Sequence, residues 1–319
     1  MIVVIGEALI DLIEDKQNKG QFQAIVGGAN CNVALALARR ESKHQFLARI
    51  STDRFGSLIK QRLIDNKVSF DHSMSTAEPT TLAVVSVDGS GKPQYNFYTE
   101  GTADWGWTRE DLPTRGQLKA MNATAIQFGC LTMAIEPGNK VVEAWAKELQ
   151  NDLTISHDIN VRPALGFDRA EQRARVERIN SFSHIIKASD EDIEWLYDLA
   201  PETDPTEIIQ TWINNSNKLV LLTKGSKGTR IYRNNETIEV PARQTTVVDT
   251  VGAGDTFIAH LIAQLDENNH LGSNPLTNLS NTDLTEYVRI ASIGASLACE
   301  KSGCEPPTVT AFSNYGQIY

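Results

Sequence analysis

Residues 249–257 place an acidic side chain beside a stretch of backbone that carries almost no side chains. Gly252, Ala253 and Gly254 can bend sharply and turn their N–H groups toward one point. Apolar residues at helical spacing follow, which predicts a helix N-terminus where free N–H groups and the helix dipole favour an anion. Asp255 would repel a bound phosphate unless it had a chemical role there. We therefore expect it to accept the proton of an alcohol that attacks the phosphate, rather than to be solvated beside an ordinary glycine turn.

Asp11, Gly27, Gly28 and Asn32 form a second group of residues suited to a ligand. Asp11 follows the predicted strand 2–5, and open α/β sheets bind ligands beyond their strand ends. Its two oxygens can each accept a hydrogen bond from a sugar hydroxyl. The glycines let the backbone approach a ligand, and the Asn32 amide can both donate and accept. Taken alone, Asp11 also fits a solvated strand end and the glycines fit an ordinary helix start.

Arg162 follows another predicted strand, 153–157. Its planar guanidinium can neutralise a transferred phosphate or hold sugar oxygens, and the alternative is a structural Arg–Asp pair in a loop. Ser189 precedes a run of acidic residues, which is typical of a capped helix start whether or not a metal is nearby. The glycines of the turn 223–228 are equally compatible with a plain β-turn.

The elements that must position these residues alternate along the chain. Short buried strands are expected at 2–5, 45–50, 123–128, 153–157, 184–186 and 218–222. Helices are expected at about 30–39, 55–66, 138–150, 168–181, 189–199, 206–214 and 283–301. This order predicts parallel β-α units with helices on both faces of a sheet.

Residues 11–26 and 74–104 break the alternation, because they have strand-like content and turns without a long helix. The second segment contains a hairpin around the turn 88–91. We interpret both segments as one small β-sheet lid. Tyr95 and Phe97 share one strand face there, which suits stacking on a sugar and equally suits the lid's own hydrophobic face. The α/β body is then made of residues 1–10, 27–73 and 105–319.

Composition excludes several classes of protein. The chain has 319 residues, 41% of them hydrophobic, and a formal net charge of −10 without any basic block, so we expect no nucleic acid partner. It contains no run of about 18 apolar residues and no secretory leader, so we expect no membrane contact. The four cysteines lack CxxC or metal spacing, which favours free thiols and a cytoplasmic protein. No P-loop or dinucleotide fingerprint is present.

The segment 249–255 closely resembles the D-T-x-G-A-G-D signature of the ribokinase-like, or PfkB, carbohydrate kinases. Residues 27–34 resemble the family's G-G-A-x-x-N-x-A signature, and residues 158–163 resemble the D-x-N-x-R-P segment of fructokinases. The resemblance spans nearly the whole chain and is nearest to bacterial fructokinases. It implies a three-layer α/β/α body with a mostly parallel central sheet, a small β-sheet lid, and ATP-dependent phosphorylation of a ketohexose, with fructose expected. The alternatives are a 2-keto-3-deoxygluconate kinase and a non-catalytic sugar- or nucleotide-binding regulator.

The resemblance also implies roles for individual residues. Asp255 is the expected base, with Arg162 and the N–H groups of residues 252–254 neutralising the phosphate. The sugar is expected to meet Asp11, Gly27, Gly28, Asn32, Tyr95, Phe97 and Arg162. The nucleotide is expected at Lys187, Ser189, Thr223, Gly225 and Gly228. The implied cofactors are ATP, Mg²⁺ held through water by Asp192 or Glu191, and a candidate K⁺ near Asp249, Val251 and Gly303. A homodimer formed through the lid is a candidate assembly.

Four positions depart from related sequences. Ser51 replaces a glycine, Asp192 is one methylene shorter than the family's glutamate, and His260 stands where a small residue is usual, so we expect it to pack. Thr99 occupies a place where 2-keto-3-deoxygluconate kinases often carry an arginine. Because Lys92 is the only basic residue between positions 76 and 104, a neutral hexose fits the lid better than an acid.

Overall fold

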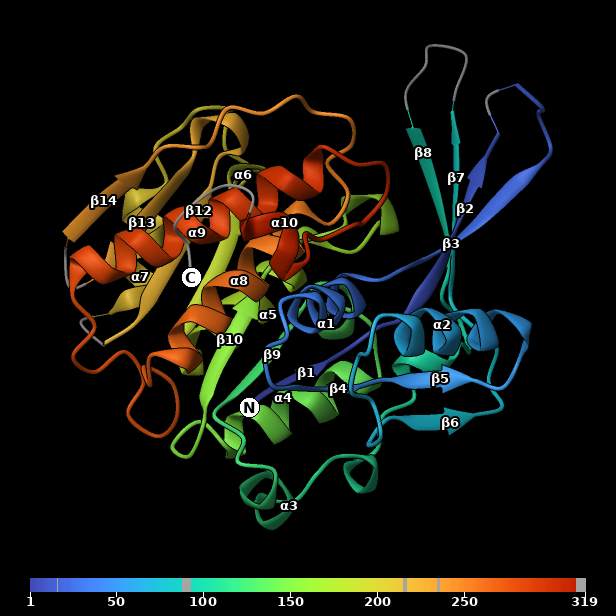
Figure 1. Ribbon diagram of the computed structural model, residues 1–319, viewed down its shortest axis with the longest axis horizontal. Coiled ribbons are helices and arrows are strands. Elements are labelled where there is room, and N and C mark those ends of the chain that lie inside the picture. The colour runs from blue at the N-terminus through green and yellow to red at the C-terminus, as the bar shows by residue number, and fades with distance from the viewer. Residues whose placement is uncertain (16, 88–92, 215–216, 234–235, 314–319) are drawn as a thin grey trace.

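The computed structural model describes residues 1–15, 17–87, 93–214, 217–233 and 236–313. Its body is built on a sheet with the strand order β14-β13-β12-β11-β10-β9-β1-β4 (Figure 1). The parallel strands are β1 (Ile2–Ile5), β4 (His44–Leu47), β9 (Ala125–Gly129), β10 (Thr154–Asp158), β11 (Ile185–Ser189) and β12 (Leu219–Thr223). The antiparallel edge consists of β13 (Thr229–Arg233) and β14 (Glu236–Val240). The predicted mostly parallel α/β sheet is therefore confirmed.

Helices cover both faces of this sheet, which explains why its strands are apolar on both sides. In β1, Ile2 and Val4 join the core beneath α1, α8 and α9, whereas Val3 and Ile5 join the core beneath α4. The helices are α1 (Ala29–Arg39), α2 (Arg54–Asp65), α3 (Arg115–Ala120), α4 (Gly138–Glu148), α5 (Arg169–Phe182), α6 (Asp190–Tyr197), α7 (Thr206–Ile213), α8 (Ala253–Glu267), α9 (Asn281–Cys299) and α10 (Val309–Ser313). Short 3₁₀ turns lie at η1 (Ala103–Trp105), η2 (Arg109–Asp111), η3 (Cys130–Met133), η4 (Pro163–Leu165) and η5 (Gly225–Lys227).

A second sheet of order β3-β2-β7-β8 projects from the body (Figure 1). Its strands are β2 (Leu9–Glu14), β3 (Phe22–Gly27), β7 (Leu82–Val87) and β8 (Pro93–Tyr98). The strands β2 and β7 pair in parallel, and the other neighbours pair antiparallel. We call this sheet the lid. The predicted turn 88–91 lies outside the described residues.

Two expectations need correction, and further elements were not predicted. The predicted strand 45–50 is divided, because β4 ends at Leu47 and β5 (Arg49–Ser51) pairs with β6 (Met74–Thr76) in a separate sheet. At the start of β5, Arg49 donates to the Ala103 carbonyl and pairs with Asp111, which ties this strand to the segment 103–111. The strand β6 therefore does not belong to the lid sheet. The hairpin β13–β14 and the helix α3 were not predicted.

Within the described ranges, no helix is both long enough and apolar enough to cross a membrane.

Candidate active site

The structure brings Asp255 and Asn32 into contact, although 223 residues separate them. Asp255 lies in the first turn of α8 and is only 6% exposed, and the Asn32 Nδ2 on α1 donates to its Oδ2 at 2.9 Å. Burial, followed by the neighbouring Asp158 carboxylate, raises the pKa of Asp255 to about 7, although Asn32, Lys187 and Arg162 act to lower it. A carboxyl with a pKa near neutrality is well suited to accept a proton at physiological pH.

The backbone before Asp255 has N–H groups available for an anion. Gly252 caps α8 in a left-handed conformation with φ 75°. Among the residues that the structure describes, no acceptor meets the N–H of Gly252 or Gly254. The N–H of Ala253 instead donates to the Thr250 carbonyl at 3.2 Å. Two of the three expected N–H groups are therefore open at this helix end, and the third, that of Ala253, is engaged by Thr250 in this structure.

Lys187 lies under this helix end. Its Nζ donates to both carboxylate oxygens of Asp158, at 2.8 and 2.9 Å, and both side chains are buried. A Cβ placed on Gly254 would lie only 3.1 Å from the same Nζ. Burial alone would lower the pKa of Lys187, but the adjacent Asp158 raises it, so the ammonium stays charged. The positive charge of Lys187 therefore lies beside Gly254 and its open N–H group.

Asp11 lies on the lid strand β2, with its carboxylate beside Gly27 of the neighbouring strand β3. A Cβ on Gly27 would lie 2.2 Å from the Asp11 Oδ2, so only glycine leaves space for the carboxylate. Burial raises the pKa of Asp11 to about 6, while Arg162 lowers it. Gly28 begins α1 with φ 104°, and a Cβ there would lie 2.5 Å from the Glu7 carbonyl oxygen. These close approaches bring the lid strands and the start of α1 against one another.

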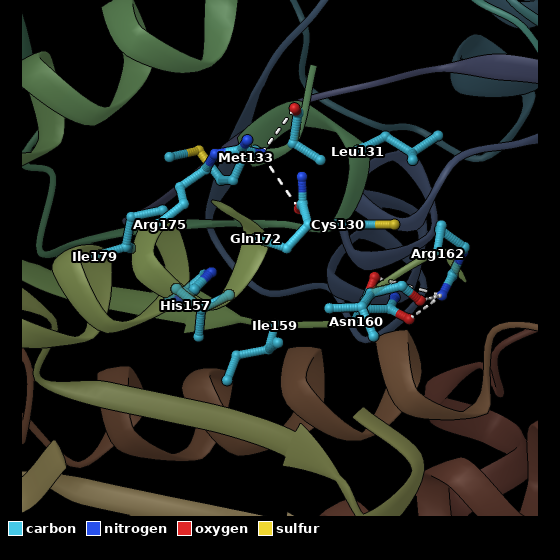
Figure 2. Close-up of a pocket in the computed structure, with 13 residues that line it drawn as sticks. Cys130, Leu131, Met133, His157, Ile159, Asn160, Arg162, Gln172, Arg175 and Ile179 are labelled. Carbon is cyan, nitrogen blue, oxygen red and sulfur yellow. Dashed lines mark hydrogen bonds between the residues drawn. The ribbon is translucent and has the colours of Figure 1, made fainter. Parts of the chain in front are cut away.

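Arg162 lies in the loop that follows β10. Its Nη1 donates to the carbonyl of Val161 at 3.0 Å and to both oxygens of Asn160 (Figure 2). None of the hydrogen-bond partners described for Arg162 is a carboxylate, and the nearby Asp158 pairs with Lys187 instead. Cys130 and Asn160 line a small pocket with Arg162, and Arg175 closes its far side by donating to the carbonyls of residues 133 and 134.

The residues expected at the nucleotide lie at the carboxyl ends of β11 and β12. Ser189 pairs with Thr223 across these strands. The turn that follows is tight, because a Cβ on Gly228 would lie 2.2 Å from the Val240 carbonyl oxygen. Gly225 begins this turn with φ 51°. Ser189 also caps α6, where its Oγ accepts from the Asp192 N–H at 3.1 Å.

Asp192 and Glu191, the residues expected to hold Mg²⁺ through water, differ in how available their carboxylates are. Asp192 accepts hydrogen bonds from the N–H of Val161 at 2.8 Å and from the N–H and Oγ of Ser189, each at 2.8 Å. Its lone pairs are therefore largely committed to the protein, and Glu191 is exposed. Across the described residues, no group of three His, Cys, Asp or Glu side chains could hold a metal.

The three residues of the candidate K⁺ site do come together. Asp249 accepts from the N–H of Val251 at 3.1 Å through one oxygen and from the N–H of Gly303 at 2.9 Å through the other. Each oxygen keeps a second lone pair, so the donor set remains compatible with a monovalent cation.

The aromatic residues of the lid and the unusual His260 were also singled out from the sequence. Phe97 is half-buried against an apolar cluster that joins lid and body, including Leu9 and Trp105. The side chain of Tyr95 lies outside the described residues. His260 is fully buried, contacts Phe312, and its Nδ1 hydrogen-bonds the Thr256 carbonyl at 2.9 Å.

Two contacts that matter to the geometry were not predicted from the sequence, although Asp158 was expected to face substrate or metal-bound water at the end of its strand. Asp158 is the counter-ion of Lys187 and raises the pKa of Asp255. Its place in the D-x-N-x-R-P segment was the only sequence feature that marked it. Cys304 packs against Gly252, so closely that a Cβ on the glycine would lie 2.2 Å from its Sγ. No sequence pattern indicates that contact, because it joins two loops distant in the chain.

The chain is similar in sequence and in fold to known carbohydrate kinases. A family model described as pfkB family carbohydrate kinase matches residues 1–311. The fructokinase of Rhizobium leguminosarum bv. trifolii is 34% identical over 286 residues, covering 89% of this chain and 85% of that protein. The crystal structure of fructokinase with bound ATP from Xylella fastidiosa matches with a TM-score of 0.87 and 24% identity, covering 98% of this chain and 97% of that one. A fructokinase double mutant from Vibrio cholerae, bound to fructose, ADP and potassium ion, matches with a TM-score of 0.80 and 24% identity, covering 98% and 97%.

Proposed function

The chain belongs to the pfkB family of carbohydrate kinases and is an ATP-dependent sugar kinase, and from this premise we propose that its substrate is a ketohexose, fructose. The observation that carries the proposal is the buried Asp255 beside the open N–H groups at the start of α8. A pure binding protein would gain nothing from an acid beside a phosphate, so this arrangement supports turnover. The fructokinases of Rhizobium leguminosarum and Xylella fastidiosa support the choice of substrate.

In the proposed reaction, Asp255 accepts the proton of a sugar hydroxyl as the hydroxyl oxygen attacks the γ-phosphorus of ATP. Phosphoryl transfer leaves the protein mainly to position the reactants and to stabilise negative charge. The N–H groups of Gly252 and Gly254 and the Lys187 ammonium stand where that charge develops. Arg162 neutralises the transferred phosphoryl group, since none of its described partners is a carboxylate.

The sugar is proposed to lie between the lid and the body. Asp11 accepts hydrogen bonds from two sugar hydroxyls in the space that Gly27 leaves open. Asn32 orients Asp255 and borders the same space, and Phe97 supplies an apolar surface from the lid. These contacts need no basic side chain, which agrees with a neutral sugar.

ATP is proposed to extend from the start of α8 to Ser189, Thr223 and the turn 225–228. Mg²⁺ would be held chiefly by the ATP phosphates and water, because Asp192 has few free lone pairs and Glu191 is exposed. When bound, it would neutralise phosphate charge. Potassium accompanies fructose and ADP in the Vibrio cholerae structure, and Asp249, Val251 and Gly303 are the residues proposed to hold it here.

The lid is also the proposed dimer surface. It exposes Ile13 (39%), Phe22 (45%) and Tyr98 (61%), which are large apolar side chains in a sheet with free edges. Pairing two lids would cover this surface.

Steady-state kinetics with fructose, ribose, glucose and 2-keto-3-deoxygluconate test the substrate. A buried carboxylate without a paired cation costs several kcal/mol, and Arg162 would have to serve both the keto acid and the phosphate. We therefore expect kcat/KM for fructose to exceed that for the keto acid by about 10². A better rate with the keto acid would contradict the argument from the lid, and ligand binding without phosphoryl transfer would indicate a regulator.

A further inference from the structure

The loop 299–306, which follows α9, supports the anion-binding end of α8 from behind. The Cys299 carbonyl accepts from the N–H groups of Val248 and Asp249, at 2.8 and 3.2 Å. The Gly303 N–H donates to Asp249 at 2.9 Å, and the Cys304 Sγ fills the space beside Gly252. The position of the Gly252 N–H therefore depends on where this loop lies.

Two arginines hold the loop from its other side. Arg39 at the end of α1 and Arg62 near the end of α2 bind the Glu305 carboxylate at 2.6 and 2.5 Å, one through each oxygen. Each arginine also donates to a loop carbonyl next to Glu305. Arg62 reaches the Cys304 carbonyl at 3.2 Å, and Arg39 reaches the Pro306 carbonyl at 2.9 Å. We call Arg39, Arg62 and Glu305 the loop clamp.

The clamp shares a helix with the active site. Asn32, which holds Asp255, and Arg39 lie seven residues apart on α1, a spacing of about 10 Å along a helix. The same rigid element therefore fixes the Asp255 carboxylate at one end and the loop behind Gly252 at the other. The second arginine connects the loop to α2, which contacts the lid strands β2 and β3.

We propose that Glu305 is a positioning residue for phosphoryl transfer: by closing the clamp, it sets the distance between the Gly252 N–H and the Asp255 carboxylate. Glu305 touches neither the sugar nor the nucleotide in this scheme and acts only through Cys304 and Gly252. The charge is essential because one carboxylate must bind two guanidinium groups at once. The inference rests on the proposed function, since it assumes that the start of α8 holds the phosphate.

Replacement of Glu305 by Gln tests the clamp with little change in shape. We expect kcat to fall about tenfold or more, because small displacements of catalytic groups slow reactions steeply. The KM for fructose should stay within about twofold, since Asp11 and Asn32 are untouched. Glu305→Asp should restore part of the lost kcat. The matched control is Glu143→Gln, which removes a similar Arg-paired carboxylate, bound to Arg178, away from this loop.

Arg62→Gln is a second route to the same result if Glu305→Gln folds poorly. It should lower kcat in the same way, and the double variant should be no slower than the slower single variant, because both remove one interaction. A kcat within twofold of the native value in both single variants would overturn the proposal. So would equal losses of kcat and Tm in Glu305→Gln and Glu143→Gln. If Asp255→Asn also kept its kcat, the proposed catalytic role of the start of α8 would be wrong. If Asp255→Asn were inactive while both clamp variants kept native kcat, only the clamp would be contradicted.

Discussion

The position of the Asp11 carboxylate depends on Gly27, because only a residue without a side chain leaves room for it. The Oδ2 of Asp11 occupies the volume that a Cβ on Gly27 would fill, so the motif glycine and the lid carboxylate act as one unit. Burial raises the pKa of Asp11 to about 6 despite the lowering effect of the nearby Arg162, so the carboxylate is mostly ionised and accepts hydrogen bonds at neutral pH. An ionised acceptor in a half-buried position is suited to bind neutral hydroxyls strongly.

Asp11→Ala should therefore weaken sugar binding selectively. Loss of a hydrogen bond to a charged group costs about 1.5–3 kcal/mol, which corresponds to a rise of about tenfold or more in the KM for fructose. The KM for ATP should change far less. Steady-state kinetics with both substrates varied provide the measurement, and the exposed Asp15 on the same hairpin provides the control Asp15→Ala. An equal rise in both KM values would mean that Asp11 supports the fold and does not touch sugar.

At the scale of elements, the start of α8 is the decisive feature. The left-handed Gly252 ends one loop and begins the helix, and the loop 299–306 packs directly on it. The open N–H groups at this helix end belong to Gly252 and Gly254, which have no side chains to cover them. The same packing makes the position sensitive to one methyl group.

Gly252→Ala should lower both kcat and Tm. An L-residue in the left-handed region costs about 1–2 kcal/mol, and the new methyl would also collide with the Cys304 Sγ. Gly20→Ala is the matched control, because Gly20 has φ 84° but nothing within 4 Å of an added Cβ. We expect kcat to fall at least tenfold in the first variant and to stay within about twofold in the second. Native kcat in Gly252→Ala would remove the helix end from the mechanism.

At the scale of the whole molecule, local patterns predicted most of the fold and long-range contacts completed the site. The apolar strands and the helical spacing marked the parallel sheet, and the glycine motifs marked where ligands could approach. The division of strand 45–50 was not predictable, because Arg49 turns toward Asp111 and Ala103, which are far away in sequence. The ion pair between Lys187 and Asp158 and the contact between Cys304 and Gly252 were missed for the same reason.

The central claim joins segments from across the chain: Asn32 from α1 holds Asp255 from α8 as the base of a sugar kinase. The most direct test is the kcat of Asp255→Asn with fructose and ATP, with sugar binding measured on the same preparation. The asparagine keeps the shape of the side chain but cannot accept the hydroxyl proton, so kcat should fall by about 10² or more while fructose binding and Tm are retained. A variant that keeps near-native kcat would contradict the assignment of Asp255 as the base.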